Sequence, residues 1–105
     1  MNILFVENHQ IFAKFVTGKF LNQHQVTIVP KISDAWAILS KEQTEIDIVL
    51  VDFDLDDGKG DKLIENIKAH HLNVKMVAVS SHNNGNMALQ KAGADAICGK
   101  HWGCD

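Results

Sequence analysis

Five short apolar runs recur along the chain, separated by stretches with helical spacing. The runs are NILFV (2–6), QVTIV (25–29), IDIVLV (46–51), VKMVAV (74–79) and ADAIC (94–98). The third and fourth are nearly continuous and rich in β-branched residues, which is typical of strands buried on both faces of a parallel sheet. The alternation predicts a βαβαβαβαβ order and hence an α/β domain with right-handed crossover connections.

The first two intervening segments carry apolar residues at helical spacing. Segment 8–21 has a broad apolar stripe that comprises Ile11, Phe12, Phe15, Val16, Phe20 and Leu21. Segment 33–41 begins with Ser33, the predicted N-cap, and is expected to bury Trp36, Ile38 and Leu39.

The next two segments differ in how strongly they favour a helix. Segment 60–70 places Leu63, Ile64 and Ile67 on one side. Segment 82–93 is the weaker helix, because its first turn contains "NNG", and Gly93 is expected to end it. The sequence stops seven residues after the fifth run, too few for a further helix. We therefore expect the first helix to be the main cover of one sheet face.

Length and composition indicate a single domain over 1–105. A chain of 105 residues can bury roughly two-thirds of its unfolded surface. The net charge of −3 comes without a basic block, which argues against nucleic-acid binding. No apolar run approaches the roughly 20 residues that span a bilayer, and no signal peptide is recognisable. Cys98 and Cys104 are too few for a disulfide framework, so a cytoplasmic location is expected. The histidines are scattered and form no zinc pattern.

The residues that follow the predicted strands are polar and reactive. The first strand leads into Glu7 and Asn8, the third into Asp52, the fourth into Ser80, and the fifth, through Gly99, into Lys100. Open parallel sheets bind their ligands beyond the carboxyl ends of the strands. We therefore expect acid, hydroxyl and amine groups to meet at one edge of the sheet.

Aspartates follow the third run in close succession: Asp52, Asp54, Asp56 and Asp57. Two carboxylates about 4 Å apart repel by roughly 4 kcal/mol at an effective dielectric near 20. Such a cluster needs a bound cation or a change in its protonation, and Mg²⁺ prefers oxygen ligands. The simpler interpretation of Asp54, Asp56 and Asp57 is that they form a turn, because "DLDDGKG" is rich in turn residues. An EF-hand loop is excluded, since Asp57 and Leu63 stand where that loop needs Gly and Glu.

These residues carry a resemblance. The segments "ILFVENH", "DIVLVDFDLDDGKGDKLIENI", "MVAVSSH" and "AGADAICGK" stand in the order and spacing of a response-regulator receiver domain of two-component signalling. The resemblance implies a flavodoxin-like, doubly wound, five-stranded parallel sheet of order 2-1-3-4-5, here without the final helix. It implies that a histidine kinase or a phosphotransfer protein phosphorylates Asp52. The implied Mg²⁺ ligands are Glu7, Asn8, Asp52 and the backbone carbonyl of Asp54. Ser80 and Lys100 would hold the phosphoryl oxygens.

The sequence departs from the family pattern at several positions. Asn8 stands where the family has a second acid, and Asp56 replaces the usual proline. His101 follows Lys100 where proline is usual, and Ile97 occupies the place of an aromatic switch residue. Asn8 could instead be the N-cap of the first helix.

The departures leave more than one function open. The first hypothesis is a phosphoacceptor that turns over no separate substrate and is therefore not an enzyme in the usual sense. The second is a pseudo-receiver that binds proteins without phosphorylation. A flavodoxin-like enzyme or nucleotide binder is the weakest, because "VENHQ" offers no glycine-rich phosphate loop. A sheet face without its final helix also predicts a homodimer, with Trp102 involved.

Overall fold

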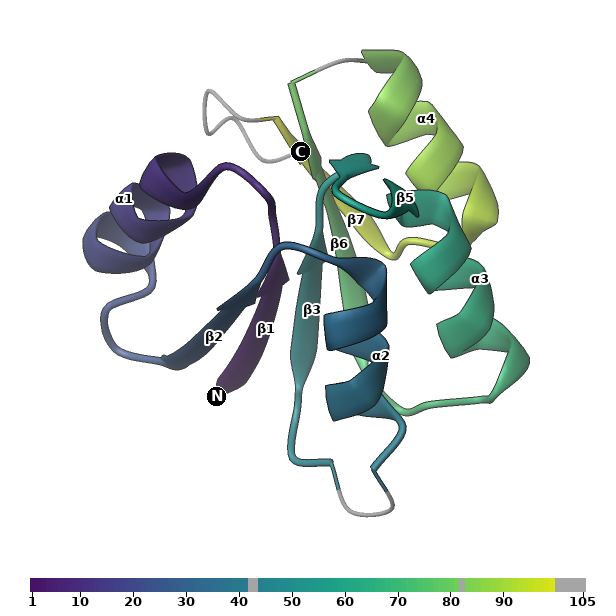
Figure 1. The fold of residues 1–105 in the computed structure, drawn as a ribbon, viewed down its shortest axis with the longest axis horizontal. Coiled ribbons are helices and arrows are strands. Elements are labelled where there is room, and N and C mark those ends of the chain that lie inside the picture. The colour runs from purple at the N-terminus through teal and green to yellow at the C-terminus, as the bar shows by residue number, and fades with distance from the viewer. Residues whose placement is uncertain (42–43, 82, 100–105) are drawn as a thin grey trace.

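The structure, a computed structural model of the chain, describes residues 1–41, 44–81 and 83–99. Within these ranges, five strands form one parallel sheet in the order β2-β1-β3-β6-β7, and β4 and β5 form a separate antiparallel pair. The strands are β1 (Asn2–Val6), β2 (Gln25–Val29), β3 (Ile48–Val51), β4 (Asp54–Leu55), β5 (Gly58–Lys59), β6 (Lys75–Ser80) and β7 (Ala96–Gly99). The helices are α1 (Gln10–Phe20), α2 (Ile32–Leu39), α3 (Gly60–Ala69) and α4 (Asn83–Ala92). Figure 1 shows the arrangement.

The predicted strands and their order are confirmed. Runs 2–6 and 25–29 coincide with β1 and β2, and the last three runs begin one or two residues before their strands. With the β4–β5 pair set aside, the spatial order is the predicted 2-1-3-4-5. The short pair lies in the aspartate-rich segment, where the sequence predicted only a turn.

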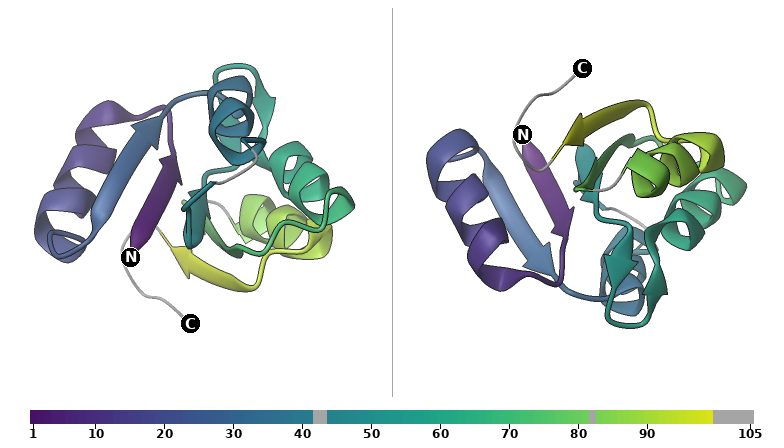
Figure 2. Two further views of the ribbon diagram at one scale, coloured as in Figure 1. Left: turned by 90° about the horizontal axis from the view of Figure 1, so that it is seen from below. Right: turned by 90° about the horizontal axis from the view of Figure 1, so that it is seen from above.

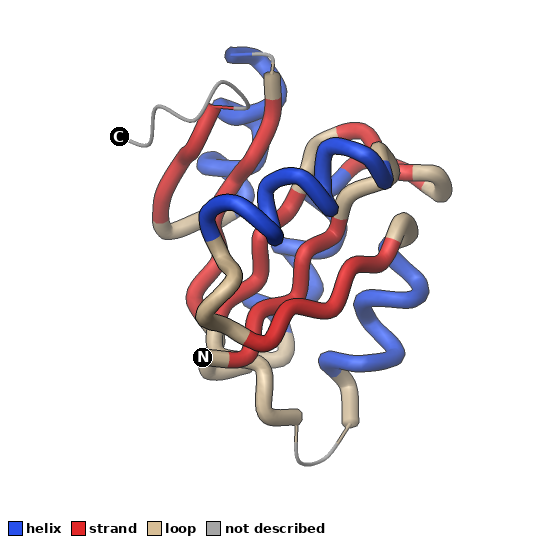
Figure 3. The backbone as a smooth tube through the Cα atoms, turned by 90° about the vertical axis from the view of Figure 1, so that its left-hand side faces the viewer, coloured by secondary structure: helices blue, strands red, loops and turns tan. Residues whose placement is uncertain are grey.

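The helices lie on the two faces of the sheet. Figures 1 and 2 show α1 on one face and α2, α3 and α4 on the other, so that within the described residues α1 covers its face alone. Figure 3 shows α1 crossing in front of the strands. The core beneath α2, α3 and α4 includes Leu4, Val6, Val49, Val51, Leu63, Ile64, Ile67, Met76 and Ala78. The core on the α1 side comprises Ile3, Phe5, Ala13, Val16, Leu50, Val79 and Cys98.

The apolar stripe predicted for α1 is wrong in part. Ala13 and Val16 are fully buried, whereas Ile11 is 79% exposed and Phe15 is 55% exposed. With 3.6 residues per turn, Ile11 and Phe15 lie on the side of the helix away from Ala13 and Val16. Phe20, also part of the predicted stripe, is 49% exposed, so three large apolar side chains of α1 remain at the surface.

Two predicted helix caps are also wrong. The N-cap position of α2 is Lys31, and Ser33 lies inside the first turn. The N-cap of α1 is His9, not Asn8, and His9 Nδ1 accepts a hydrogen bond from the Phe12 N–H at 3.1 Å. The predicted end of α4 is confirmed, because Gly93 has a φ of 129° and its N–H donates to Leu89 O.

Some predictions fall on residues outside the described ranges. These residues are Lys100, His101, Trp102 and Cys104. Within the described ranges, no helix combines the length and the apolar character that a membrane crossing requires.

Candidate functional site at the carboxyl edge of the sheet

Glu7 and Asp52 leave neighbouring strands side by side. Their predecessors, Val6 and Val51, are register partners, and the Asp52 N–H donates to Val6 O at 3.0 Å. The Glu7 residue is fully buried and Asp52 is only 4% exposed. Glu7 Oε2 accepts a hydrogen bond from the His9 N–H at 3.2 Å, which orients the carboxylate beside the start of α1. The structure therefore brings these two predicted site residues together in a buried position.

Ser80 is the last residue of β6 and is also buried. The next strand over, β3, pairs Val51 with Ala78, so Ser80 belongs to the same edge of the sheet as Asp52. Helix α4 presses closely against this edge at Gly85. A Cβ added to Gly85 would lie 2.7 Å from Ser80 Oγ and 3.0 Å from Phe53 Cβ. Only glycine fits this contact without movement of its neighbours.

Asn86 is a buried residue at this edge that sequence reasoning missed. The buried polar or charged residues in the described part of the chain are Glu7, Asp52, Ser80 and Asn86. Asn86 Nδ2 donates to the carbonyl oxygen of Ser80 at 3.0 Å. Its Oδ1 is buried and has no hydrogen-bond partner among the described residues, an arrangement that costs about 1–3 kcal/mol. The signal available in the sequence was the "GN" pair on the inner side of the fourth helix, since neither residue favours a helix interior.

Asn8 contacts the aspartate-rich segment. It is exposed, and its Nδ2 donates to Asp56 Oδ1 at 3.3 Å. A side-chain hydrogen bond thereby joins the β1–α1 loop to the β4–β5 turn.

Asp54 and Asp57 have separate contacts. Asp54 forms an ion pair with Lys59, across the short β4–β5 pairing, and Lys59 Nζ also lies 5.1 Å from the centroid of the Phe53 ring. Asp57 caps helix α2, because its Oδ1 accepts from the Ile32 N–H at 2.7 Å and its Oδ2 from the Ser33 N–H at 3.0 Å.

The hydrogen bonds to Asp57 affect its ionisation. Burial raises the pKa of the Asp57 carboxyl, but the N–H groups of Ser33 and Ile32 and the Ser33 side chain outweigh this effect. The pKa is therefore lower than its ordinary value of 3.8. The carboxylate form is the one that the helix terminus stabilises.

Gly60 fixes the segment that follows Asp52. Its N–H donates to Phe53 O at 2.7 Å, and an added Cβ would lie 2.0 Å from the carbonyl oxygen of Asp52. This approach holds the start of α3 directly against the main chain of the central aspartate.

Comparison with known proteins agrees with this architecture. The family model described as "Response regulator receiver domain" matches residues 3–103. The chain belongs to the receiver domain family. The "Two-component response regulator-like APRR3" of Arabidopsis thaliana is 33% identical over 87 residues, which are 80% of this chain and 18% of that protein. The chain thus spans less than a fifth of this curated relative.

Solved receiver domains share the fold. A response regulator receiver domain protein from Methanospirillum hungatei superimposes with a TM-score of 0.80 at 22% identity, over 94% of this chain and 80% of that one. The Mn²⁺-bound form of response regulator Rcp1 gives a TM-score of 0.76 at 19% identity, over 91% and 78% of the two chains.

The donor set of this receiver domain fits Mg²⁺. In the described part of the chain, no group of three His, Cys, Asp or Glu side chains is arranged to hold a metal ion. Glu7 and Asp52 nevertheless provide two buried carboxylates at neighbouring strand ends. Mg²⁺ commonly binds through one or two carboxylates and keeps several waters, so a pair of acids with neutral oxygen donors suits it.

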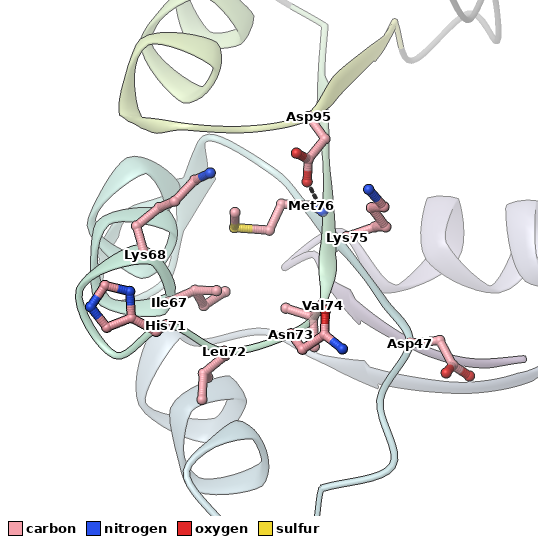
Figure 4. A pocket seen from close by; sticks show the side chains of 10 residues that line it. All are labelled: Asp47, Ile67, Lys68, His71, Leu72, Asn73, Val74, Lys75, Met76 and Asp95. Carbon is pink, nitrogen blue, oxygen red and sulfur yellow. Dashed lines mark hydrogen bonds between the residues drawn. The ribbon is translucent and has the colours of Figure 1, made fainter.

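A surface hollow lies at the opposite edge of the receiver domain. Figure 4 shows its lining, which comes from the end of α3, the loop from α3 to β6, the start of β6, Asp47 before β3 and Asp95 before β7. There the Asp95 carboxylate accepts a hydrogen bond from the Met76 N–H at 2.9 Å. The lining contains none of the predicted site residues, so the hollow is separate from the carboxyl edge of the sheet, where Glu7, Asp52 and Ser80 lie.

Proposed function

We propose that this receiver domain accepts a phosphoryl group on Asp52 in the presence of Mg²⁺, with a histidine kinase or a phosphotransfer protein as donor. The observation that carries the proposal is the burial of Glu7, Asp52 and Ser80 together at the carboxyl edge of the sheet. Burying these groups is unfavourable for a fold that does not use them, since two carboxylates at neighbouring strand ends repel each other. A site that binds a cation and an anionic group accounts for all three.

The proposed step is a direct transfer. A carboxylate oxygen of Asp52 attacks the phosphorus of a phosphohistidine, and the new P–O bond forms as the P–N bond breaks. The electron pair of the P–N bond returns to the imidazole, which takes up a proton from solvent. The Ser80 hydroxyl donates to one phosphoryl oxygen, and the Lys100 ammonium contacts another. These contacts stabilise the charge that develops on the phosphoryl oxygens.

Glu7, Asn8, Asp52 and the main-chain carbonyl of Asp54 are the residues that would hold Mg²⁺. When bound, the ion neutralises charge on the carboxylates and the incoming phosphoryl group. The product is an aspartyl phosphate on the protein itself, so the domain acts as a signalling module and turns over no separate substrate. We place this activity in the cytoplasm.

Intact-protein mass spectrometry tests the proposal directly. The parent, Asp52→Asn and Asp56→Asn are incubated with acetyl phosphate, with and without Mg²⁺. We expect a gain of one phosphoryl group on the parent and on Asp56→Asn, only with Mg²⁺, and no gain on Asp52→Asn. Asp56→Asn is the matched control, because it removes an exposed carboxylate from the same segment. An equal gain on Asp52→Asn, or none on a folded parent, would contradict the proposal.

A second function is favoured by one specific contact. Asn8 is neutral and its amide is bonded to Asp56, so position 8 offers the metal less charge than a second acid would. A pseudo-receiver that binds partners without phosphorylation agrees with this contact. It predicts that a partner binds the parent and Asp52→Asn with equal affinity and that Mg²⁺ changes no property of the protein.

The face of the sheet beside α1 supports a homodimer. Ile48 and Val77, which pack against the buried residues Leu50, Val79 and Cys98, are only partly buried and present an apolar surface there. A second copy could cover this surface with its own equivalent residues. Sedimentation velocity at high micromolar concentration should show a dimer, and a monomer under those conditions would contradict this arrangement.

A further inference from the structure

The first turn of helix α4 is in direct contact with the carboxyl edge of the sheet, where the proposed site residues Glu7, Asp52 and Ser80 lie. Gly85 leaves space for Ser80 Oγ and for the Phe53 side chain, which belongs to the residue after Asp52. The end of β6 and the segment that follows β3 therefore meet the same turn of one helix. Because the contact is close, a shift of Ser80 would require α4 to move as well.

Asn86, the next residue of this turn, holds the main chain of Ser80. Its Nδ2 donates to Ser80 O at 3.0 Å, and its side chain is buried together with the hydroxyl-bearing residue that it contacts. Its Oδ1 has no partner among the described residues. A buried amide with an unpaired acceptor stabilises α4 less than an apolar side chain of similar size would. The packing of the helix alone therefore does not explain an asparagine at position 86, and the hydrogen bond to Ser80 is what the amide contributes.

We infer that Asn86 is a positioning residue of the acceptor site, which acts through the carbonyl of Ser80. The carbonyl and the hydroxyl belong to the same residue, so fixing the first sets the direction in which the second leaves β6. The inference rests on the proposed function of Asp52 and extends it to α4. The side-chain hydrogen bond of Asn86 goes to Ser80, whose hydroxyl would hold the phosphoryl group, and not to the proposed metal ligands Glu7 and Asp52.

This role predicts that the rate of phosphorylation and the affinity for Mg²⁺ respond differently to loss of Asn86. Loss of the Asn86 amide should slow phosphorylation, because a misdirected Ser80 hydroxyl stabilises the transferred group less well. The affinity for Mg²⁺ should stay that of the parent. A purely structural role would instead loosen the whole edge and weaken Mg²⁺ binding together with phosphorylation.

The experiment compares Asn86→Leu with Asn84→Ala. Leucine preserves the volume and removes the hydrogen bond, and Asn84 is an exposed asparagine in the same helical turn. The rate of phosphorylation by acetyl phosphate is followed by intact mass, and Mg²⁺ binding by isothermal titration calorimetry. We expect Asn86→Leu to be phosphorylated about tenfold more slowly than the parent, with unchanged Mg²⁺ affinity. Asn84→Ala should match the parent in both measurements. Asn86→Ala serves in the same comparison if the leucine variant does not fold.

The outcomes are distinguishable from failure of the proposed function. A parent that gains no phosphoryl group rejects the proposed function and this inference with it. If the parent and Asn86→Leu are phosphorylated at the same rate, the inference about Asn86 is rejected and the proposed function stands. Slower phosphorylation accompanied by a parallel loss of Mg²⁺ affinity also rejects it, because Asn86 would then support the edge as a whole.

Discussion

The carboxylate of Asp57 accepts a hydrogen bond from the backbone N–H of Ile32, with 2.7 Å between Oδ1 and the nitrogen. The partners are 25 residues apart, and the bond joins the segment after Asp52 to the first turn of α2. A second bond from the Ser33 N–H completes the cap. Lys31, at the N-cap position itself, makes no side-chain cap bond within the described residues. The first turn of α2 therefore depends on an aspartate from another loop.

Removal of this cap should destabilise the domain. We expect Asp57→Ala to lower the free energy of unfolding by about 1 kcal/mol, because two helix N–H groups lose their acceptor. For a domain of this size, that loss lowers Tm by about 4–8 °C. Calorimetry or thermal circular dichroism measures the change. Asp56→Ala is the control, and an equal loss in both variants would show that the cap contributes nothing of its own.

The same cap gives a pH dependence of known sign. The pKa of Asp57 is lower in the folded protein than its ordinary value of 3.8, so the unfolded chain binds the proton more readily. The stabilisation is therefore complete above that value and is lost as the pH falls through the folded pKa. Urea denaturation of the parent and of Asp57→Asn should show a difference in midpoint near pH 7 that shrinks near pH 3. A difference that stays constant or grows in acid would contradict the assignment.

Replacing Gly60 and Gly18 by alanine should change the stability of the domain in opposite directions. Gly60→Ala places a Cβ 2.0 Å from Asp52 O and 2.8 Å from Val51 Cγ1, so we expect a loss of about 3 kcal/mol or more. Gly18→Ala, inside α1 and without a described atom within 4 Å of the new Cβ, should gain about 0.5–1 kcal/mol. Chemical denaturation measures both. A mild effect at Gly60 would mean that the main chain around Asp52 is free to move.

The neutral residue at position 8 should limit metal binding. We expect Asn8→Asp to raise Mg²⁺ affinity by about tenfold, because a charged ligand replaces a neutral one. Without metal the variant should be slightly less stable, since the bond to Asp56 is replaced by repulsion. Calorimetric titration gives the affinity, and Glu7→Gln, which should bind more weakly than the parent, is the control. If Asn8→Asp binds no more tightly than the parent, position 8 is not part of the metal site.

The sequence predicted the elements that depend on local pattern. The strands and the inward face of α3 follow from hydrophobic spacing, and Leu63, Ile64 and Ile67 are buried as expected. The errors arose where distant segments meet. Ser33 looked like a cap, but Asp57 takes that role from 24 residues away. The exposure of Ile11 and Phe15 depends on how α1 sits on the sheet, which spacing alone does not determine. The buried position of Asn86 depends in the same way on how closely α4 approaches β6.

Some site residues could be located from the sequence in the same way, and others could not. Glu7, Asp52 and Ser80 could be located because each directly follows or ends an apolar run, and parallel strands end at a common edge. The contact between Asn8 and Asp56 could not be foreseen, because it joins two loops whose conformations are set by neighbouring elements. The roles assigned to these residues remain predictions for the experiments above.

The register between β3 and β6 sets the levels at which Asp52 and Ser80 leave the sheet. Val51 lies opposite Ala78, so continuing the register sets Ser80 one residue, about 3.3 Å, further along the sheet than Asp52. Ser80 therefore extends past Asp52 at the carboxyl end of the sheet, and only 4% of Asp52 is exposed. Under the proposed function, the Ser80 hydroxyl and the Asp52 carboxylate would therefore be staggered along the strand direction, and a phosphoryl group would meet them at two different levels.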